Sequence, residues 1–356
     1  LAMAPAALLL PGMFLLLAGL LFKVSAVPFH MWTPDAYDGA PTPTSGFMAA
    51  GVKLGGVAAL VKVTLGVLHH GRLTTAPYGW AMVMVAVALA TITVGNVAAL
   101  RQTQVKRMLA YSSVAHVGYI LVGVIAAGTF YGGAFSTDRM KSGEEVAWAL
   151  QTGDTALSAV LYYVLAYGVA TLGAFACVAW FGSNKHEALE SYQWNGLAQR
   201  HPGMALGMTV CLLGLLGMPP TAGFMGKMWL FRGALEHDNI WLRLLVLVAL
   251  LNTVVGAYYY LRLIVAMYFR PAPEEEAQVT PLSGRGSQAV VAVCAALTLF
   301  VGVSTDTLMR PAQKAAAGYI HPAGSDARAR AVADAMGAGE VIETAQREVS
   351  AETDPA

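Results

Sequence analysis

The sequence predicts an all-α protein that crosses a membrane several times, and its composition leads to that prediction. Only 12% of the 356 residues are charged, about half the fraction usual for a soluble globular domain. Hydrophobic residues make up 56% of the chain, and the mean hydropathy is +0.56. So few charges could not cover a soluble protein of this length, so a polytopic membrane protein is the class that remains. The net charge of +1 argues against a nucleic-acid partner, which would need a basic surface.

Eight apolar stretches are long enough to cross the roughly 30 Å core of a bilayer as helices of about 20 residues. In chain order they cover residues 4–27, 43–68, 78–100, 105–127, 157–182, 204–235, 242–269 and 287–305. The third and the fifth stretch contain no Asp, Glu, Lys or Arg at all. The predicted fold is therefore a bundle of about eight transmembrane helices over residues 1–316, followed by a polar tail over residues 317–356.

The first and the sixth stretch are interrupted by proline close to a lysine. Pro28 follows Lys23 in the first stretch, and Pro219 and Pro220 precede Lys227 in the sixth. Proline removes a backbone donor and clashes with the preceding turn, so it frees carbonyl groups at membrane depth. Broken helices of this kind line ion sites in transporters, whereas a simple proline kink is a packing device. The lysine beside each break favours the functional interpretation.

Basic residues in the loops predict the orientation of the helices. Arg101, Lys106 and Arg107 form the densest basic cluster, which we place in the cytoplasm. Alternation of the helices then puts on the same side the loops that carry Lys185, Arg200, Arg270 and Arg285. The opposite loops carry Arg72, Arg139 and Lys141.

Ionisable residues inside the spans are functional candidates, because burying them in a membrane is costly. Charges at the extreme ends of the stretches, such as Lys106, are set aside. The remaining candidates are Lys23, Lys53, Lys62, Lys227, Arg262 and His116. Acidic residues are expected only at or beyond the ends of the spans. The counter-charge of the lysines should therefore come from another chain or from a segment that precedes Leu1.

These candidates differ in how well a structural role explains them. Lys62 and Arg262 lie within a few residues of a helix end, where long side chains reach the interface, so we favour that role for them. Lys53 and Lys227 lie too deep for this explanation. For His116 a proton relay and a hydrogen-bonded core histidine are both open.

Motifs of soluble enzymes and metal sites are missing. The residues before Lys227 do not form a phosphate loop, because Thr221 occupies the place of the first glycine. Cys177, Cys211 and Cys294 lie in apolar stretches without a C-x-x-C pair, so no zinc site, iron–sulfur cluster or disulfide framework is indicated. We expect no metal and no cofactor in this chain.

Three motifs carry a resemblance to a known family. They are FKVSAVPFHMWTPDAYDGAPTP at residues 22–43, KRMLAYSSVAHVGY at residues 106–119 and GMPPTAGFMGK at residues 217–227. In this order they resemble subunit N of bacterial respiratory complex I, the proton-translocating NADH:quinone oxidoreductase. The sister subunits L and M share the antiporter-like fold, but the TPDAYDG run favours subunit N.

The resemblance implies a fold of fourteen helices in two inverted repeats, of which this chain would contain helices 7–14. Helices 1–6, with a glutamate on helix 5, would precede Leu1, so we expect the N-terminal part to be missing. By the same analogy Lys23, Lys53 and Lys227 are the lysines of helices 7, 8 and 12, and they form a proton relay together with His116. Residues 138–154 resemble a lengthened outer loop without an assigned role.

The implied function is proton translocation in the bacterial inner (plasma) membrane, coupled to electron transfer from NADH to quinone in other subunits. FMN and iron–sulfur clusters are expected in those partner subunits, and the neighbours are expected to include the antiporter-like subunit M and subunit K. Three alternatives stay open: a subunit of a multi-subunit cation/proton antiporter, a subunit of a membrane-bound hydrogenase-type complex, and a purely structural subunit. The last alternative leaves the buried lysines unexplained.

Overall fold

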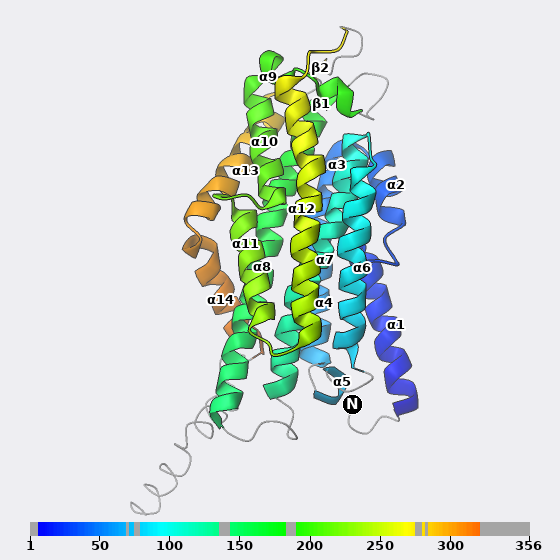
Figure 1. The fold of residues 1–356 in the computed structure, drawn as a ribbon, viewed down its shortest axis with the longest axis vertical. Helices are drawn as coiled ribbons and strands as arrows, with labels where there is room; N and C mark the ends of the chain where they lie inside the picture. Colours follow the sequence, from blue (N-terminus) through cyan, green and yellow to red (C-terminus); the bar gives the residue numbers. More distant parts are fainter. Residues whose placement is uncertain are drawn as a thin grey trace, which may run out of the picture.

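The computed structural model describes residues 6–68, 71–74, 79–134, 143–182, 190–274, 280–281 and 284–320. The long helices run side by side along the long axis of the molecule (Figure 1). In chain order the helices are α1 Ala6–Val24, α2 Trp32–Gly39, α3 Thr42–Phe47, η1 Met48–Val52, α4 Lys53–Val61, η2 Lys62–Val67, α5 Gly71–Thr74, α6 Trp80–Leu100, α7 Val105–Ala134, α8 Gly143–Trp180, η3 Ser191–Trp194, α9 Leu197–Arg200, α10 Pro202–Leu216, α11 Ala222–Leu235, α12 Ile240–Phe269, α13 Arg285–Val303 and α14 Asp306–Ile320. Two strands of two residues, β1 Phe181–Gly182 and β2 Thr280–Pro281, pair antiparallel. The predicted helical bundle is confirmed.

Six helical runs within the described residues are long and apolar enough to cross a membrane. They are Thr42–Val67, Trp80–Leu100, Val105–Ala134, Glu145–Trp180, Ile240–Phe269 and Arg285–Val303. Within the described residues the first and the sixth predicted stretch contain the shorter apolar helices Leu9–Val24 and Pro202–Leu216, and the second of these ends shortly before Pro219 and Pro220. Every predicted stretch therefore coincides with a helix or a pair of helices, but helix length does not confirm the count of eight spans.

Helix α7 lies at the centre of the bundle. In its most apolar window of 18 residues 94% of the positions are buried, against 28% for α13. Its sequence is apolar on all sides, which is the pattern of a helix surrounded by other helices. It packs against α6, α8 and α11. Polar side chains of α7 must therefore find their hydrogen-bond partners inside the protein.

Helix α8 begins earlier than the sequence predicted. The predicted loop over residues 138–154 is wrong from Gly143 onward, because α8 already starts there; residues 138–142 lie outside the described residues. The carboxylate of Asp154 accepts a hydrogen bond of 2.6 Å from the hydroxyl of Tyr131 near the end of α7. This contact explains how a helix can carry acidic residues in its first turns and still pack on the bundle. The charge-free fifth stretch that the sequence predicted, residues 157–182, therefore corresponds only to the later part of α8.

Helix α14 crosses the boundary that the sequence predicted for the polar tail. It continues to Ile320, and its Met309, Ala312 and Ala316 are buried in the interface with α8 and neighbouring elements. Residues 321–356 lie outside the described residues, so the polar tail stays a prediction.

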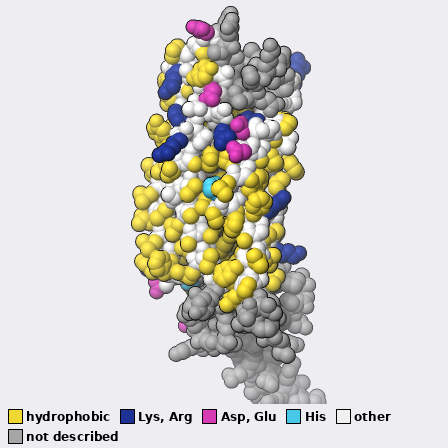
Figure 2. Space-filling view, turned by 90° about the vertical axis from the view of Figure 1, so that its right-hand side faces the viewer, with side chains coloured by type: hydrophobic (Ala, Val, Ile, Leu, Met, Phe, Trp, Pro, Cys, Tyr) yellow, Lys and Arg dark blue, Asp and Glu magenta, His cyan; other side chains and the backbone are white. Residues whose placement is uncertain are grey.

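The described loops that were predicted to share the basic side meet at one end of the molecule, where Figure 1 shows α9, β1 and β2. A backbone bridge between Gln104 and Glu190 ties two of these loops together. In Figure 2 hydrophobic side chains cover the middle of the face, and most of the visible charged side chains lie toward this end. Lys185, Arg139 and Lys141 lie outside the described residues. The cytoplasmic location of this end stays a prediction.

Candidate functional site

Helix α7 presents three polar side chains at a spacing of three residues: Ser113, His116 and Tyr119. Successive members are about 4.5 Å apart along the helix axis and lie on neighbouring positions of its surface. All three are buried, with at most 3% of each residue exposed. Each contacts a polar or charged side chain on another helix.

Lys53 reaches Ser113 from the start of α4. Its side chain is buried, and its Nζ donates a hydrogen bond of 2.7 Å to Oγ of Ser113. The π-helical segment η1 precedes Lys53 directly and loosens the regular backbone pattern, as such segments often do at functional sites. The carbonyl of Ala49 in this segment accepts a hydrogen bond from the hydroxyl of Tyr167.

His116 has a hydroxyl group beside each of its ring nitrogens. Nδ1 lies 2.7 Å from the hydroxyl of Tyr163 on α8, and Nε2 lies 3.1 Å from the hydroxyl of Tyr260 on α12. The hydroxyl of Tyr260 also contacts that of Ser112. An imidazole bonded on both sides can take a proton at one nitrogen and release it at the other. The same bonds would also satisfy a core histidine, so both interpretations of His116 stay open at this point.

Lys227 lies against the break between α10 and α11. Gly217 adopts the left-handed conformation (φ 81°), and its N–H bonds to the carbonyl of Leu213, which is the usual glycine ending of a helix. The last carbonyls of α10 are thereby left for another donor. Nζ of Lys227 donates to the carbonyls of Leu215 at 3.3 Å and Leu216 at 2.7 Å. Pro219 and Pro220 then prevent α10 from continuing, so the break and the lysine form one unit.

Hydroxyl and carbonyl oxygens, and not carboxylates, accept the hydrogen bonds of the Lys53 and Lys227 ammonium groups. Within the part of the chain that the structure describes, no carboxylate lies within 4.0 Å of Nζ of Lys53 or Lys227. The described residues also contain no group of three or more His, Cys, Asp or Glu side chains that could hold a metal ion. A buried ammonium without a carboxylate is sensitive to any charge placed nearby.

Lys23 does not join Lys53, His116 and Lys227. Its side chain is exposed, although its stem lies against α4, where a Cβ atom on Gly56 would be 3.5 Å from Cγ of Lys23. Lys62 is exposed as well, in agreement with the favoured helix-end role. Arg262 donates to the carbonyls of Leu100 and Gln102 at the end of α6, and its helix-end role stays a prediction.

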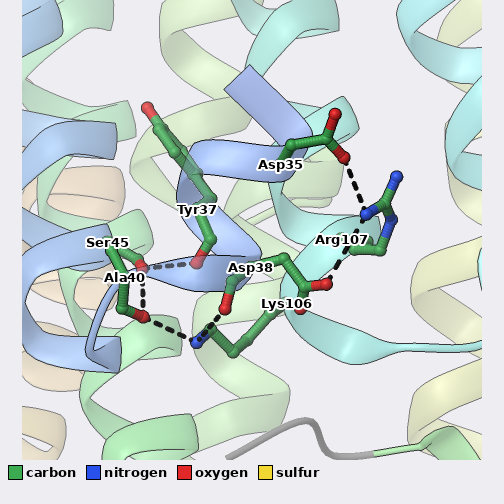
Figure 3. A network of polar contacts seen from close by, with 7 residues as sticks. All are labelled: Asp35, Tyr37, Asp38, Ala40, Ser45, Lys106 and Arg107. Carbon is green, nitrogen blue, oxygen red and sulfur yellow. Dashed lines mark hydrogen bonds and ion pairs between the residues drawn. The ribbon is translucent and has the colours of Figure 1, made fainter. Parts of the chain in front are cut away.

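Lys106 is a buried lysine that the sequence analysis set aside as a helix-end charge. It is fully buried, and its Nζ donates to the carbonyls of Asp38 at 3.0 Å and Ala40 at 2.9 Å (Figure 3). The next residue, Arg107, pairs with Asp35 at 2.9 Å. The two neighbouring basic residues thus fasten α2 to the start of α7. This contact joins the first two of the three sequence motifs.

A family model described as "NADH:quinone oxidoreductase/Mrp antiporter, TM" matches residues 2–137 and 146–253. The chain belongs to this family. The matched segments include Lys23, Lys53, His116 and Lys227. The roles of these four residues stay a prediction, because the match concerns the family and not its individual positions.

Relatives within the NADH:quinone oxidoreductase/Mrp antiporter family support the resemblance to subunit N. NADH-quinone oxidoreductase subunit N 1 of Sorangium cellulosum is 43% identical over 310 residues, which are 87% of this chain and 56% of the relative. Subunit N of Mycobacterium tuberculosis H37Rv is 40% identical and is covered to 52%, with 86% of this chain. The chain therefore spans about half the length of the curated relatives that it matches.

Solved structures show the same fold. A chain of respiratory complex I from Thermus thermophilus with bound aureothin is 31% identical, with a TM-score of 0.68, over 86% of this chain and 60% of that one. A chain of the Mrp complex from Dietzia has a TM-score of 0.69 at 19% identity, over 87% of this chain and 59% of that one. The second likeness concerns the fold alone. The antiporter-like fold that the sequence predicted is confirmed.

Proposed function

We propose that this protein is a membrane subunit of a bacterial NADH:quinone oxidoreductase of the subunit N type, and that it moves protons across the plasma membrane. The names of its relatives support the kind of complex. The observation that carries the proton function is the buried array on α7, in which Lys53 bonds to Ser113, His116 bonds to two tyrosines, and Lys227 lies at a helix break. Titratable groups of this kind inside a membrane protein mark ion and proton pathways.

The mechanism is electrostatic. At an effective dielectric constant of about 20, two unit charges about 8 Å apart interact by about 2 kcal/mol, which changes the occupancy of a proton site by a factor of about 30. Protonation of one lysine therefore lowers the proton affinity of the next. A charge shift that starts in a partner subunit can move along the array without any redox chemistry in this chain.

His116 lies between the contacts of Lys53 and Lys227 along α7. Ser113, which holds Lys53, lies one turn before it on α7, and Tyr119, whose ring faces Lys227, lies one turn after it. The hydroxyls of Tyr163 and Tyr260 bracket its ring and fix the ring orientation. We assign His116 the relay role on the basis of this intermediate position.

Lys23 has a separate place in the proposal. Its side chain is exposed on α1, close to the break at Pro28. By the family resemblance it would pair with the glutamate of helix 5 of the antiporter-like fold. Lys23 would then receive the charge shift before it reaches Lys53.

The proposed partners supply the redox chemistry. FMN and iron–sulfur clusters would reside in other subunits, quinone would bind at the level of the complex, and the neighbouring membrane subunits would include M and K. A cation/proton antiporter subunit is the alternative with the same fold, followed by a subunit of a hydrogenase-type complex. Relatives named as subunit N favour the oxidoreductase.

The test replaces Lys53 and Lys227 singly by Ala in the assembled complex. Lys62→Ala is the matched control, because Lys62 follows on the same helical run as Lys53 but is exposed. We expect NADH-driven proton uptake into inverted membrane vesicles to fall at least tenfold for both variants and to stay normal for the control. Native gels and NADH oxidation with an artificial electron acceptor check that the complex is assembled.

Normal proton uptake by either assembled variant would contradict the relay. A cation/proton antiporter would instead show transport that depends on Na⁺ or K⁺ and not on NADH. Repeating the assay after exchange of Na⁺ for choline therefore separates the two functions.

A further inference from the structure

Tyr119 belongs to a polar cluster between α6, α7 and α12 whose other members have no part in the relay described above. Asn96, Tyr119 and Tyr259 are buried and Thr253 is half-buried, and we call these four residues the Tyr119 cluster. Buried polar networks of this kind fix a unique arrangement of the side chains around them. The question is which group the cluster orients.

The ring of Tyr119 faces the ammonium group of Lys227. Nζ of Lys227 lies 4.7 Å from the centroid of this ring. The face of an aromatic ring carries the negative part of its quadrupole and attracts a cation, most strongly where water is excluded. The other contacts of the ammonium group are the last carbonyls of α10, which form the negative end of a helix dipole. The ammonium group is thus held by a ring face and a helix end.

The hydroxyl group of Tyr119 holds its ring in this orientation. Nδ2 of Asn96 lies 3.4 Å and Oγ1 of Thr253 lies 3.3 Å from the hydroxyl oxygen. Asn96 is itself fixed, because its Nδ2 donates to the carbonyl of Ile92 and its Oδ1 accepts a hydrogen bond of 3.0 Å from Tyr259. The ring is therefore anchored at its hydroxyl end, while Lys227 lies over its face.

Glycines bring α6 and α7 close enough for the short side chain of Asn96 to reach Tyr119. A Cβ atom on Gly95 would lie 2.6 Å from the backbone nitrogen of Ala115, and one on Gly118 would lie 2.8 Å from that of Ile92. Gly95 precedes Asn96 and Gly118 precedes Tyr119. Helices α6 and α7 thus approach each other closely beside the Tyr119 cluster.

We infer that Tyr119 is a positioning residue for proton transfer: its ring face takes the place of a carboxylate as the charge partner of Lys227, and Asn96 sets the orientation of that ring. The inference rests on the proposed function. The ring of His116 lies 6.0 Å from that of Tyr119 between centroids, so the same ring holds the ammonium group beside the histidine.

The test changes the ring electronics of Tyr119 without changing its shape. Tyr119→Phe and replacement of Tyr119 by pentafluorophenylalanine both remove the hydroxyl, but fluorination reverses the charge distribution on the ring face. In assembled complex we expect the number of protons moved per NADH to be at least fivefold lower for the fluorinated variant than for Tyr119→Phe. Equal values for the two variants would overturn the inference.

Phe130 provides the matched control. It is buried on the same helix, and its ring packs against those of Trp148 and His237. The same fluorination at Phe130 should leave the protons moved per NADH unchanged; an equal loss there would mean that fluorination acts through packing and would overturn the inference.

Asn96→Leu tests the orienting role. We expect Asn96→Leu and Tyr119→Phe each to lower proton transfer two- to fivefold, and the double variant to lose no more than the worse single variant, because both act on one ring. Additive losses would overturn the role of Asn96. If Lys227→Ala pumps normally, the proposed function fails; if it does not pump but fluorination has no effect, only the role of Tyr119 fails.

Discussion

Removal of the Ser113 hydroxyl gives a direct measure of how Lys53 takes part in proton transfer. Ser113→Ala deletes the oxygen that accepts the 2.7 Å hydrogen bond from Nζ of Lys53. Because both residues are buried, water cannot easily replace this partner. A hydrogen bond to a charged group contributes about 1.5–3 kcal/mol, which corresponds to a change of about 10- to 100-fold in the population of ammonium held at this position.

Proton uptake by inverted membrane vesicles, driven by NADH, is the assay. We expect the protons moved per NADH to fall several-fold in Ser113→Ala, while assembly of the complex is unchanged, because a serine-to-alanine change leaves little space. Ser113→Thr keeps a hydroxyl group at this position and should recover most of the lost transfer.

Thr129→Val is the matched control for this experiment. Thr129 is also buried on α7, but its hydroxyl donates to the carbonyls of Ile125 and Ala126 of its own helix. Its removal should leave the proton yield unchanged. A normal proton yield in assembled Ser113→Ala would refute the reasoning that this hydroxyl holds the Lys53 ammonium group for transfer.

Three further predictions concern other parts of the chain. Lys23→Ala and Lys23→Arg should both impair proton uptake, since guanidinium stays protonated up to about pH 12 and cannot relay; rescue of uptake by Arg would show a structural counter-ion instead. Lys106→Met removes the donor of two hydrogen bonds to the carbonyls of Asp38 and Ala40, and an unsatisfied buried polar group costs about 1–3 kcal/mol. The assembled complex should therefore lose heat stability in a thermal shift assay, and an unchanged melting temperature would contradict this role. Truncation after Ile320 should keep assembly and pumping. Truncation before Asp306 should reduce assembly on native gels, because it removes α14 and its buried face. A loss of assembly on truncation after Ile320 would show instead that the tail is the docking element.

The sequence alone predicted the helical bundle, the two broken helices and the depth of Lys53, His116 and Lys227. These features are local. Hydropathy over about 20 residues defines a span, adjacent prolines interrupt a helix, and a charge far from both ends of a span lies at membrane depth in any arrangement of the helices. The three motifs were sufficient for the resemblance to the family, and the family match agrees with it.

The start of α8 and the helix after residue 306 were not predictable in the same way. Both segments carry charged residues, so hydropathy places them outside the spans. They are helical because particular contacts hold them, such as the hydrogen bond from Tyr131 to Asp154 and the buried methyl group of Ala316. Contacts between residues far apart in the chain leave no local signal.

Only the tertiary structure decided which partners the buried groups have. The position of Tyr163 and Tyr260 inside predicted spans was a signal, but nothing in the sequence says that they meet His116. Helix α7 is buried on nearly all sides, so its sequence cannot tell which helix lies on which of its sides. Two lysines show how packing decides burial. Lys106 lies near a helix end but is fully buried, whereas Lys23 lies inside a predicted span but is exposed. Burial of a side chain depends on which helices cover it, and that is decided by the packing of the whole bundle.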